Sequence, residues 1–251
     1  MDSIFKRKNL KLWLKPYEIL ATSYDCGAIE FCEDSLGVDF IRKTMTEMMN
    51  RSCDLYDYFR KNFGSPAKKG PQSKNFEKAM YAFSDSLAAY SLVCYVLQIK
   101  DRHNANMLVD KDGHLIHIDF GFMLTDAPGK GLRFETAPFK LSADFVRILG
   151  GPDGEGFRRF RNSMVAGFQA LNKHSAKIIL LVQMVASAQS DLSCFKGGAK
   201  VAVDELKERL CPLGVDKKLS KADCEAYIDQ LIQESDGNWR TQMYDGYQYC
   251  I

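Results

Sequence analysis

The pattern of apolar and polar residues changes along the chain and predicts strands first and helices later. Apolar runs at 12–14 and 18–23 are separated by Pro16, and a third run at 28–32 follows the turn residues Asp25-Cys26-Gly27. An Asp-x-Gly sequence between two apolar runs is typical of a β-hairpin. We therefore predict short strands between residues 10 and 32.

Helical spacing of the apolar residues begins at residue 35 and extends to 63. Two prolines, two glycines and two lysines at 64–73 predict a surface loop. Residues 76–99 give the clearest helical pattern, and their apolar face is broad enough that we expect a buried central helix. Further helices are predicted at 142–149, 153–172, 174–190, 201–211 and 220–235.

Between these helical regions, two short apolar runs at 107–110 and 114–120 flank Asp112-Gly113. Such a two-residue sequence is typical of a tight hairpin turn. Strands that precede a series of helices favour an α+β domain, with its chemistry at the junction between the two parts. We expect a single large domain, or one lobe with a small appendage, because the chain has 251 residues.

The composition narrows the functional classes. A net charge of +2 from 34 basic and 32 acidic residues argues against nucleic acid as a partner. The apolar run at 178–186 is interrupted by Gln183 and is shorter than the roughly 18 residues that a membrane-spanning helix needs. The eight cysteines include no Cys-x-x-Cys pair, so we expect a reduced cytosolic protein whose cysteines mostly pack in the core.

The most informative stretch is 98–122, where three of the four histidines lie. A loop with Asp101, Arg102, His103 and Asn106 precedes the predicted hairpin, which ends at Asp119-Phe120-Gly121. Transfer of a phosphoryl group requires carboxylate and amide oxygens for metal ions, and a base near neutral pH for the acceptor hydroxyl. The hairpin would bring the two loops together. Gly121, two residues after Asp119, would give the following backbone freedom to turn away from the site.

Each of these residues also has an ordinary structural interpretation. A lone Asp-Phe-Gly is a weak signal, and His103 by itself could cap a loop. His114 and His117 alternate with apolar residues, so packing within a strand explains them better than catalysis. The spacing is the stronger argument, because Asp-Arg-His-x-x-Asn is followed 13 residues after its asparagine by Asp-Phe-Gly.

QIKDRHNANMLVD and HIDFGF resemble the catalytic loop and the metal-binding motif of the phosphoinositide 3- and 4-kinase superfamily. The resemblance covers roughly residues 10–250 and implies a kinase-like catalytic domain that consists mainly of its helical large lobe. Residues 1–34 would be the end of the small lobe and the hinge, and 35–251 the large lobe, with a catalytic loop at 98–106 and an activation segment at 117–141. The resemblance also implies that Asp101, Arg102 and His103 are the catalytic residues, with His103 as the base and Asp101 supporting the loop and the phosphate site. Asn106 and Asp119 would hold Mg²⁺, with Mn²⁺ as the alternative ion.

LWLKPYEIL, LRFETAPFKLSADFVRILGG and MYDGYQY are most similar to type III phosphatidylinositol 4-kinases of the beta class. This similarity implies transfer of the ATP γ-phosphate to the 4-hydroxyl of phosphatidylinositol, in phosphoinositide signalling and trafficking. It also implies peripheral attachment to Golgi or other endomembranes and recruiting proteins as partners. Ile29, Glu30, Phe31 and Cys32 would form the hinge that binds adenine, although an ordinary strand end fits them equally well.

Two departures from the family pattern affect these expectations. Ala105 stands where the family usually has glycine, and we expect activity to survive this change. The phosphate-covering loop and the ATP-contacting lysine, which precede the hinge in the family, are not recognisable, and Lys11 and Lys15 are poor substitutes. We expect a fragment of a longer protein; a mis-predicted gene start and a degenerate relative that only binds partners remain alternatives, as does a lipid-kinase-like protein kinase.

The segment 119–141 has few cations for a highly charged headgroup. Lys130, Arg133 and Lys140 are the candidate substrate-binding residues, and Asp119, Asp126 and Glu135 balance them. Because each extra phosphate adds about −1.5 to −2 charges, this segment favours phosphatidylinositol itself over its phosphorylated forms. A mobile loop without a selective role is the alternative, and Trp239 with Arg240 could either contact a membrane or pack on the lobe.

Overall fold

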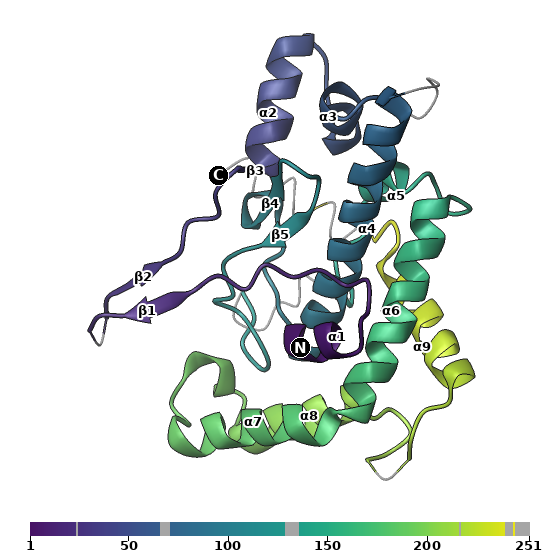
Figure 1. The fold of residues 1–251 in the computed structure, drawn as a ribbon. Helices are drawn as coiled ribbons and strands as arrows, with labels where there is room; N and C mark the ends of the chain where they lie inside the picture. The colour runs from purple at the N-terminus through teal and green to yellow at the C-terminus, as the bar shows by residue number, and fades with distance from the viewer. Residues whose placement is uncertain (24, 66–70, 129–135, 216, 239–242, 244–251) are drawn as a thin grey trace.

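The computed structural model describes residues 1–251 except 24, 66–70, 129–135, 216, 239–242 and 244–251. Its long central helix is surrounded by shorter helices and two small sheets (Figure 1). The N-terminal part contains helix α1 (Asp2–Arg7), strands β1 (Ile19–Ala21), β2 (Gly27–Ile29) and β3 (Ser35–Gly37), and helices α2 (Val38–Met49) and α3 (Leu55–Asn62). The central helix α4 (Pro71–Leu97) is followed by the 3₁₀ turn η1 (Asn104–Asn106) and strands β4 (Met107–Asp110) and β5 (Leu115–His117).

The rest of the chain is helical. It consists of α5 (Ala143–Ile148), α6 (Glu155–Lys173), α7 (Ser175–Ala188), the 3₁₀ turn η2 (Ser193–Phe195), α8 (Ala199–Leu210) and α9 (Lys221–Ser235). These helices match the five predicted after residue 141 to within a few residues. Ser220 caps α9 by accepting a hydrogen bond from the Asp223 amide, and Asp223 in turn accepts from the Ser220 amide.

Helix α4 forms the centre of the hydrophobic core. Phe83, Leu87, Leu92 and Val96 are almost completely buried and belong to one core cluster that includes residues from most of the other helices. Arg159 of α6 forms a two-point ion pair with Asp85 of α4, at 2.6 Å for each nitrogen–oxygen pair. Residues 73–97 are long and apolar enough to cross a membrane. However, 67% of the apolar 18-residue window within this stretch is buried inside the fold. The prediction of a buried central helix at 76–99 is therefore confirmed, although the helix starts at Pro71, inside the predicted loop.

The strands form two separate antiparallel sheets. β1 pairs with β2, with Ile19 opposite Ile29, while β3, β4 and β5 form a three-stranded sheet in that order. The β4–β5 turn contains Gly113, whose φ is +95°, and a Cβ there would lie 2.9 Å from Ala79 of α4. Both predicted hairpins are confirmed, and glycine is needed at the second turn for its backbone angle and for close packing on α4.

Three local predictions were wrong. Residues 12–14 are not a strand: this segment runs extended over α4, where the Trp13 amide donates to the Asp85 carbonyl at 3.3 Å. Residues 35–37 are strand β3 rather than the start of a helix, because they pair with β4, 71 or more residues away. The short helix α1, whose Ile4 and Phe5 are buried, was not predicted.

Candidate active site

The β4–β5 hairpin brings the two motif loops together. Met107 pairs with His117, and the Ile118 amide donates to the Asn106 carbonyl at 3.1 Å, so the ladder ends between the loop at 101–106 and Asp119. The three strand residues Leu115, Ile116 and His117 are all buried. The open end of this hairpin is therefore a rigid support for both loops, as the sequence predicted.

The side chain of Asn106 is fixed by Asp101. Its amide nitrogen donates to the Asp101 carbonyl at 3.0 Å and to the Asp101 carboxylate at 3.3 Å. Both donors of the amide face Asp101, so the amide oxygen points the other way. An oriented amide oxygen suits a hard divalent cation.

His103 begins the 3₁₀ turn η1 as its N-cap residue. Its Nδ1 accepts a hydrogen bond from the Ala105 amide at 3.2 Å, and its Nε2 lies 3.8 Å from a carboxylate oxygen of Asp101. With Nδ1 as the acceptor, the neutral ring carries its proton on Nε2. To take a proton from a substrate hydroxyl at either nitrogen, the ring must give up the Ala105 hydrogen bond, because the tautomer with a free Nε2 carries its proton on Nδ1. Ala105 itself lies in the 3₁₀ turn without a positive φ, so alanine fits there without strain.

Arg102 connects the loop to the second motif through the backbone. Only 3% of this residue is exposed, and its guanidinium donates to the carbonyls of Lys100 (2.9 Å), Ile118 (2.7 Å) and Asp119. The same group lies 5.6 Å from the centre of the Phe120 ring. This burial corrects the assignment of Arg102 to the catalytic residues: its guanidinium holds the backbone at Ile118 and Asp119.

Asp119 is exposed, with a left-handed backbone (φ +56°). Its Oδ1 accepts a hydrogen bond from the Gly121 amide at 3.1 Å. The prediction placed the unusual backbone at Gly121, whereas the left-handed residue is Asp119. Gly121 has a different function, because a Cβ there would lie 3.1 Å from that carboxylate oxygen. The carboxylate of Asp119 and the amide oxygen of Asn106, on two loops joined by one hairpin, are a donor set that fits Mg²⁺ or Mn²⁺.

Comparison with known proteins identifies the family of the chain. The family model described as "Phosphatidylinositol 3- and 4-kinase" matches residues 1–194. The chain belongs to this family. It is 39% identical to phosphatidylinositol 4-kinase PIK1alpha of Candida albicans, 40% to phosphatidylinositol 4-kinase beta 2 of Arabidopsis thaliana and 37% to phosphatidylinositol 4-kinase beta of Danio rerio.

Each alignment covers 99% of this chain and only 25%, 21% and 27% of the respective relative. The chain thus corresponds to a minor part of these relatives' length. The resemblance to kinases of the beta class extends over the whole sequence, and the mainly helical α+β fold agrees with membership of the kinase family.

The extended segment before β1 supports the kinase-family motifs in a way that the sequence did not reveal. Trp13 stacks on His114 with ring centres 4.1 Å apart, and Tyr17 stacks on Phe120 at 6.2 Å. The Lys15 amide is 3.2 Å from the Tyr90 hydroxyl. Burial and the nearby thiol of Cys32 raise the pKa of Tyr17, while Arg102 lowers it. Aromatic residues close to Pro16 were the available signal, but no spacing rule links them to a hairpin about 100 residues later.

The predicted hinge residues end the β1–β2 hairpin. The Glu30 amide donates to the Glu18 carbonyl at 2.9 Å, and the Glu30 side chain lies 3.5 Å from Lys15. Ile29 and Phe31 are exposed, whereas Cys32 is buried against Tyr90 and Ile116.

Of the predicted headgroup residues, only Lys140 can be placed; Lys130 and Arg133 lie outside the described residues. Lys140 is 5% exposed, and its ammonium donates to the side-chain oxygen of Asn104 at 2.9 Å. It therefore lies under the catalytic loop, which corrects the expectation of a cation on a surface segment. Asp126, counted as a surface charge, is also buried and pairs with Lys196 at 3.3 Å.

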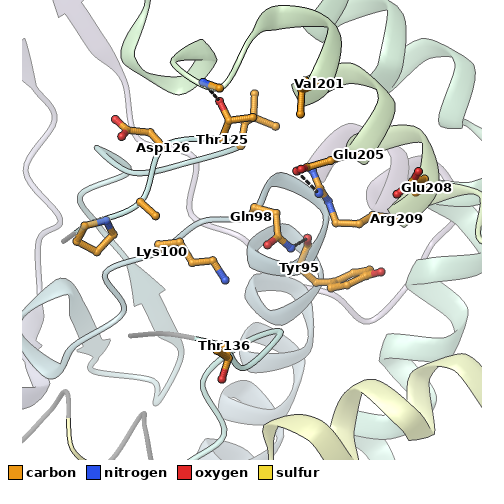
Figure 2. Close-up of a pocket in the computed structure, with 14 residues that line it drawn as sticks. Tyr95, Gln98, Lys100, Thr125, Asp126, Thr136, Val201, Glu205, Glu208 and Arg209 are labelled. Carbon is orange, nitrogen blue, oxygen red and sulfur yellow. Dashed lines mark hydrogen bonds and ion pairs between the residues drawn. The ribbon is translucent and has the colours of Figure 1, made fainter. Parts of the chain in front are cut away.

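A cavity of about 600 Å³ lies beside the motif loops (Figure 2). The end of α4, the segment 124–128 and α8 line it, and its charged residues are Lys100, Asp126, Glu205, Glu208 and Arg209. Arg209 donates to the Val96 carbonyl at 3.0 Å and to Glu205 at 3.4 Å. The cavity contains neither Asn106 nor Asp119, so the chemistry of the site lies next to it rather than inside it.

Proposed function

We propose that this chain supplies the catalytic loop and metal-binding motif of a lipid kinase that transfers the ATP γ-phosphate to the 4-hydroxyl of phosphatidylinositol. The main support is the fixed position of Asn106 and Asp119 at the open end of one hairpin, in a chain whose relatives are named phosphatidylinositol 4-kinases. The 4-hydroxyl and the lipid come from those names alone. Peripheral attachment of a cytoplasmic protein to Golgi or other endomembranes, through recruiting proteins, completes the proposal.

Each residue near the hairpin end has a proposed task. Asn106 and Asp119 would hold Mg²⁺ or Mn²⁺, which neutralises charge on the ATP phosphates when it is bound. Arg102 holds the Asp119 backbone in place, and Asp101 orients Asn106. His103 accepts the proton of the inositol hydroxyl after it releases the Ala105 amide. The adenine of ATP would contact Ile29, Glu30, Phe31 and Cys32. The headgroup would contact Lys130 and Arg133.

Asp119→Asn tests the metal site. The change keeps the side-chain volume but removes the charge, so transfer of labelled phosphate from ATP to phosphatidylinositol vesicles should fall at least about a hundredfold. The assay uses the 251-residue chain and a chimera that carries it in place of the aligned part of the Danio rerio relative. Asp112→Asn, at the other end of the hairpin, is the control and should leave turnover unchanged. An Asp119→Asn chimera with normal turnover would refute the metal role.

Substitutions of His103 distinguish its proposed role as the general base from a role limited to capping the loop. His103→Asn keeps an acceptor for the Ala105 amide but cannot accept a proton near neutral pH, while His103→Ala loses both functions. If His103 is the base, both variants should lower the turnover number by about 10²–10⁴ and leave the Michaelis constant for ATP nearly unchanged. Steady-state kinetics of the active chimera decide the question. Near-normal turnover in His103→Asn would mean that His103 only caps the loop.

A further inference from the structure

Helix α7 has an apolar outer face that the rest of the described chain leaves uncovered. Ile178, Ile179 and Ala186 are buried, whereas the opposite side exposes four large apolar residues by 45–63%: Leu180, Leu181, Met184 and Val185. A helix that is apolar on all sides is normally enclosed by protein or lipid. The exposed side of α7 is therefore a candidate docking surface, which we call the α7 face (Leu180, Leu181, Met184 and Val185).

Basic residues accompany the α7 face, and the sequence from His174 to Ser190 contains no acidic residue. Lys177, Leu181 and Met184 are spaced four and three residues apart, so they lie on one side of the helix. Desolvation and the nearby charges of Lys8, Arg7 and Lys177 lower the pKa of His174. Cations from α1 and α7 thus gather at the N-terminal end of the apolar face.

We propose that the α7 face docks on an anionic lipid surface, with Leu181 and Met184 in the apolar layer and the basic cluster of Arg7, Lys8 and Lys177 against the headgroups. A helix with exposed leucine and methionine on one side and adjoining cations suits the boundary between headgroups and acyl chains. This inference rests on the proposed function only in that a kinase with a lipid substrate must meet a membrane.

A second copy of the chain fits the α7 face less well. A symmetric contact would place equal surfaces against each other and bring the two basic clusters close together. On the neighbouring helix α8, Asp204 pairs with Lys207 at 2.9 Å and Glu205 with Arg209 at 3.4 Å, while Glu208 lines the cavity. Anionic lipid would instead neutralise the cluster.

The inner side of α7 connects this surface to the proposed active site. Ala186 belongs to a small buried cluster with Leu124, Phe195 and Ala202. The loop after α7 is bonded to Thr125, which lies in the segment that follows Asp119. The Thr125 hydroxyl donates to the Cys194 carbonyl at 2.9 Å and accepts from the Gly197 amide at 3.0 Å. Docking of the α7 face would therefore place the segment that follows Asp119 close to the lipid surface.

Vesicle sedimentation of the full 251-residue chain tests the proposal without any kinase activity. The vesicles contain phosphatidylcholine and phosphatidylserine but no phosphatidylinositol, and no ATP is added. The double variant Leu181→Glu with Met184→Glu should bind about tenfold or more weakly, because two apolar side chains no longer enter the interface. Met48→Glu on α2 is the control, since Met48 and Met184 are 62% and 60% exposed, and its binding should not change.

A charge variant and a size measurement complete the test. Lys177→Glu should weaken binding by about fivefold or more and reduce its dependence on phosphatidylserine. Absence of vesicle binding by the unmodified chain, or unchanged binding of the double variant, would overturn the proposal. So would a dimer, seen by size-exclusion chromatography, that the double variant dissociates while vesicle binding persists. Because these vesicles lack the kinase substrate, failure of the proposed function would leave the binding result unaffected.

Discussion

At the scale of single residues, His117 has the most unusual environment. Its ring is 3% exposed and stacks on Tyr90 with centres 4.7 Å apart, and its Nδ1 lies 3.4 Å from the Cys94 sulfur. Its Nε2 has no hydrogen-bond partner among the described residues. Burial, reinforced by the charges of Arg102 and Lys140, lowers the pKa of His117 well below 6.5. The folded protein therefore holds this histidine in its neutral form.

This neutral histidine makes stability depend on pH. Below about pH 6.5 the unfolded chain binds a proton at this position that the folded chain does not, so the free energy of unfolding falls as the pH decreases. One such group contributes at most about 1.4 kcal/mol per pH unit. Urea unfolding at about pH 7.5 and about pH 5.5 should show a smaller loss in His117→Phe than in the unmodified chain. His174→Gln, at a partly exposed position, should change the loss less, and an equal loss in His117→Phe would contradict the assignment.

Residue types at the site were predictable from the sequence, but their surroundings were not. His103, Asn106 and Asp119 follow from motif spacing and lie on the two loops joined by the hairpin. Arg102 was misassigned because it contacts backbone carbonyls, which every residue has and which leave no trace in a sequence. The burial of Lys140 could not be predicted either, because its partner Asn104 lies 36 residues away.

At the scale of elements, predictions succeeded where many residues share one period. The helices after residue 141 and the β4–β5 hairpin were predicted because apolar spacing and Asp112-Gly113 agree over several residues. β3 was missed because it runs directly into α2 at Val38, and α1 because only two of its six residues are apolar. The segment at 12–14 has strand-like composition, yet its partners are α4 and aromatic rings rather than another strand.

The segment that follows Asp119 is anchored to the rest of the fold at Leu124 and Thr125. Leu124 has a left-handed backbone (φ +54°), which costs energy unless its surroundings impose it. Its amide donates to the Leu97 carbonyl at 2.7 Å, and Thr125 bonds to the loop between α7 and α8. α4 and this loop thus fix the chain immediately after the proposed metal ligand.

Thr125→Val tests this anchor. The change keeps a β-branched side chain but removes the hydroxyl that bonds to the Cys194 carbonyl and the Gly197 amide, so the free energy of unfolding should fall by about 1–3 kcal/mol. Thr125→Ser retains both hydrogen bonds and should cost less than about 1 kcal/mol. Urea unfolding of both variants measures the difference. Equal stability of Thr125→Val and Thr125→Ser would show that the hydroxyl does not hold the segment.

At the scale of the whole molecule, stability is distributed unevenly. α4 contacts β5 and helices on several sides, and its residues between Phe83 and Val96 are mostly buried. The β1–β2 hairpin projects away from this core, and all six of its strand residues are exposed (Figure 1). A two-stranded hairpin without a covered face is marginal in water. The proposed adenine-binding residues therefore begin at the last residue of a hairpin that has no covered face.

Hydrogen exchange should separate these two regions. Amides of β1 and β2 should exchange through local opening that costs about 0–2 kcal/mol, because the hairpin can separate without exposing the core. Amides in the middle of α4 should require global unfolding, since opening that helix exposes Phe83, Leu87 and Leu92 together. Low concentrations of urea should therefore accelerate exchange in α4 but hardly affect the hairpin. The β4–β5 hairpin is the matched comparison, because its strands are mostly buried and should follow α4. Equal protection of the two hairpins would mean that the exposed hairpin folds as part of the core.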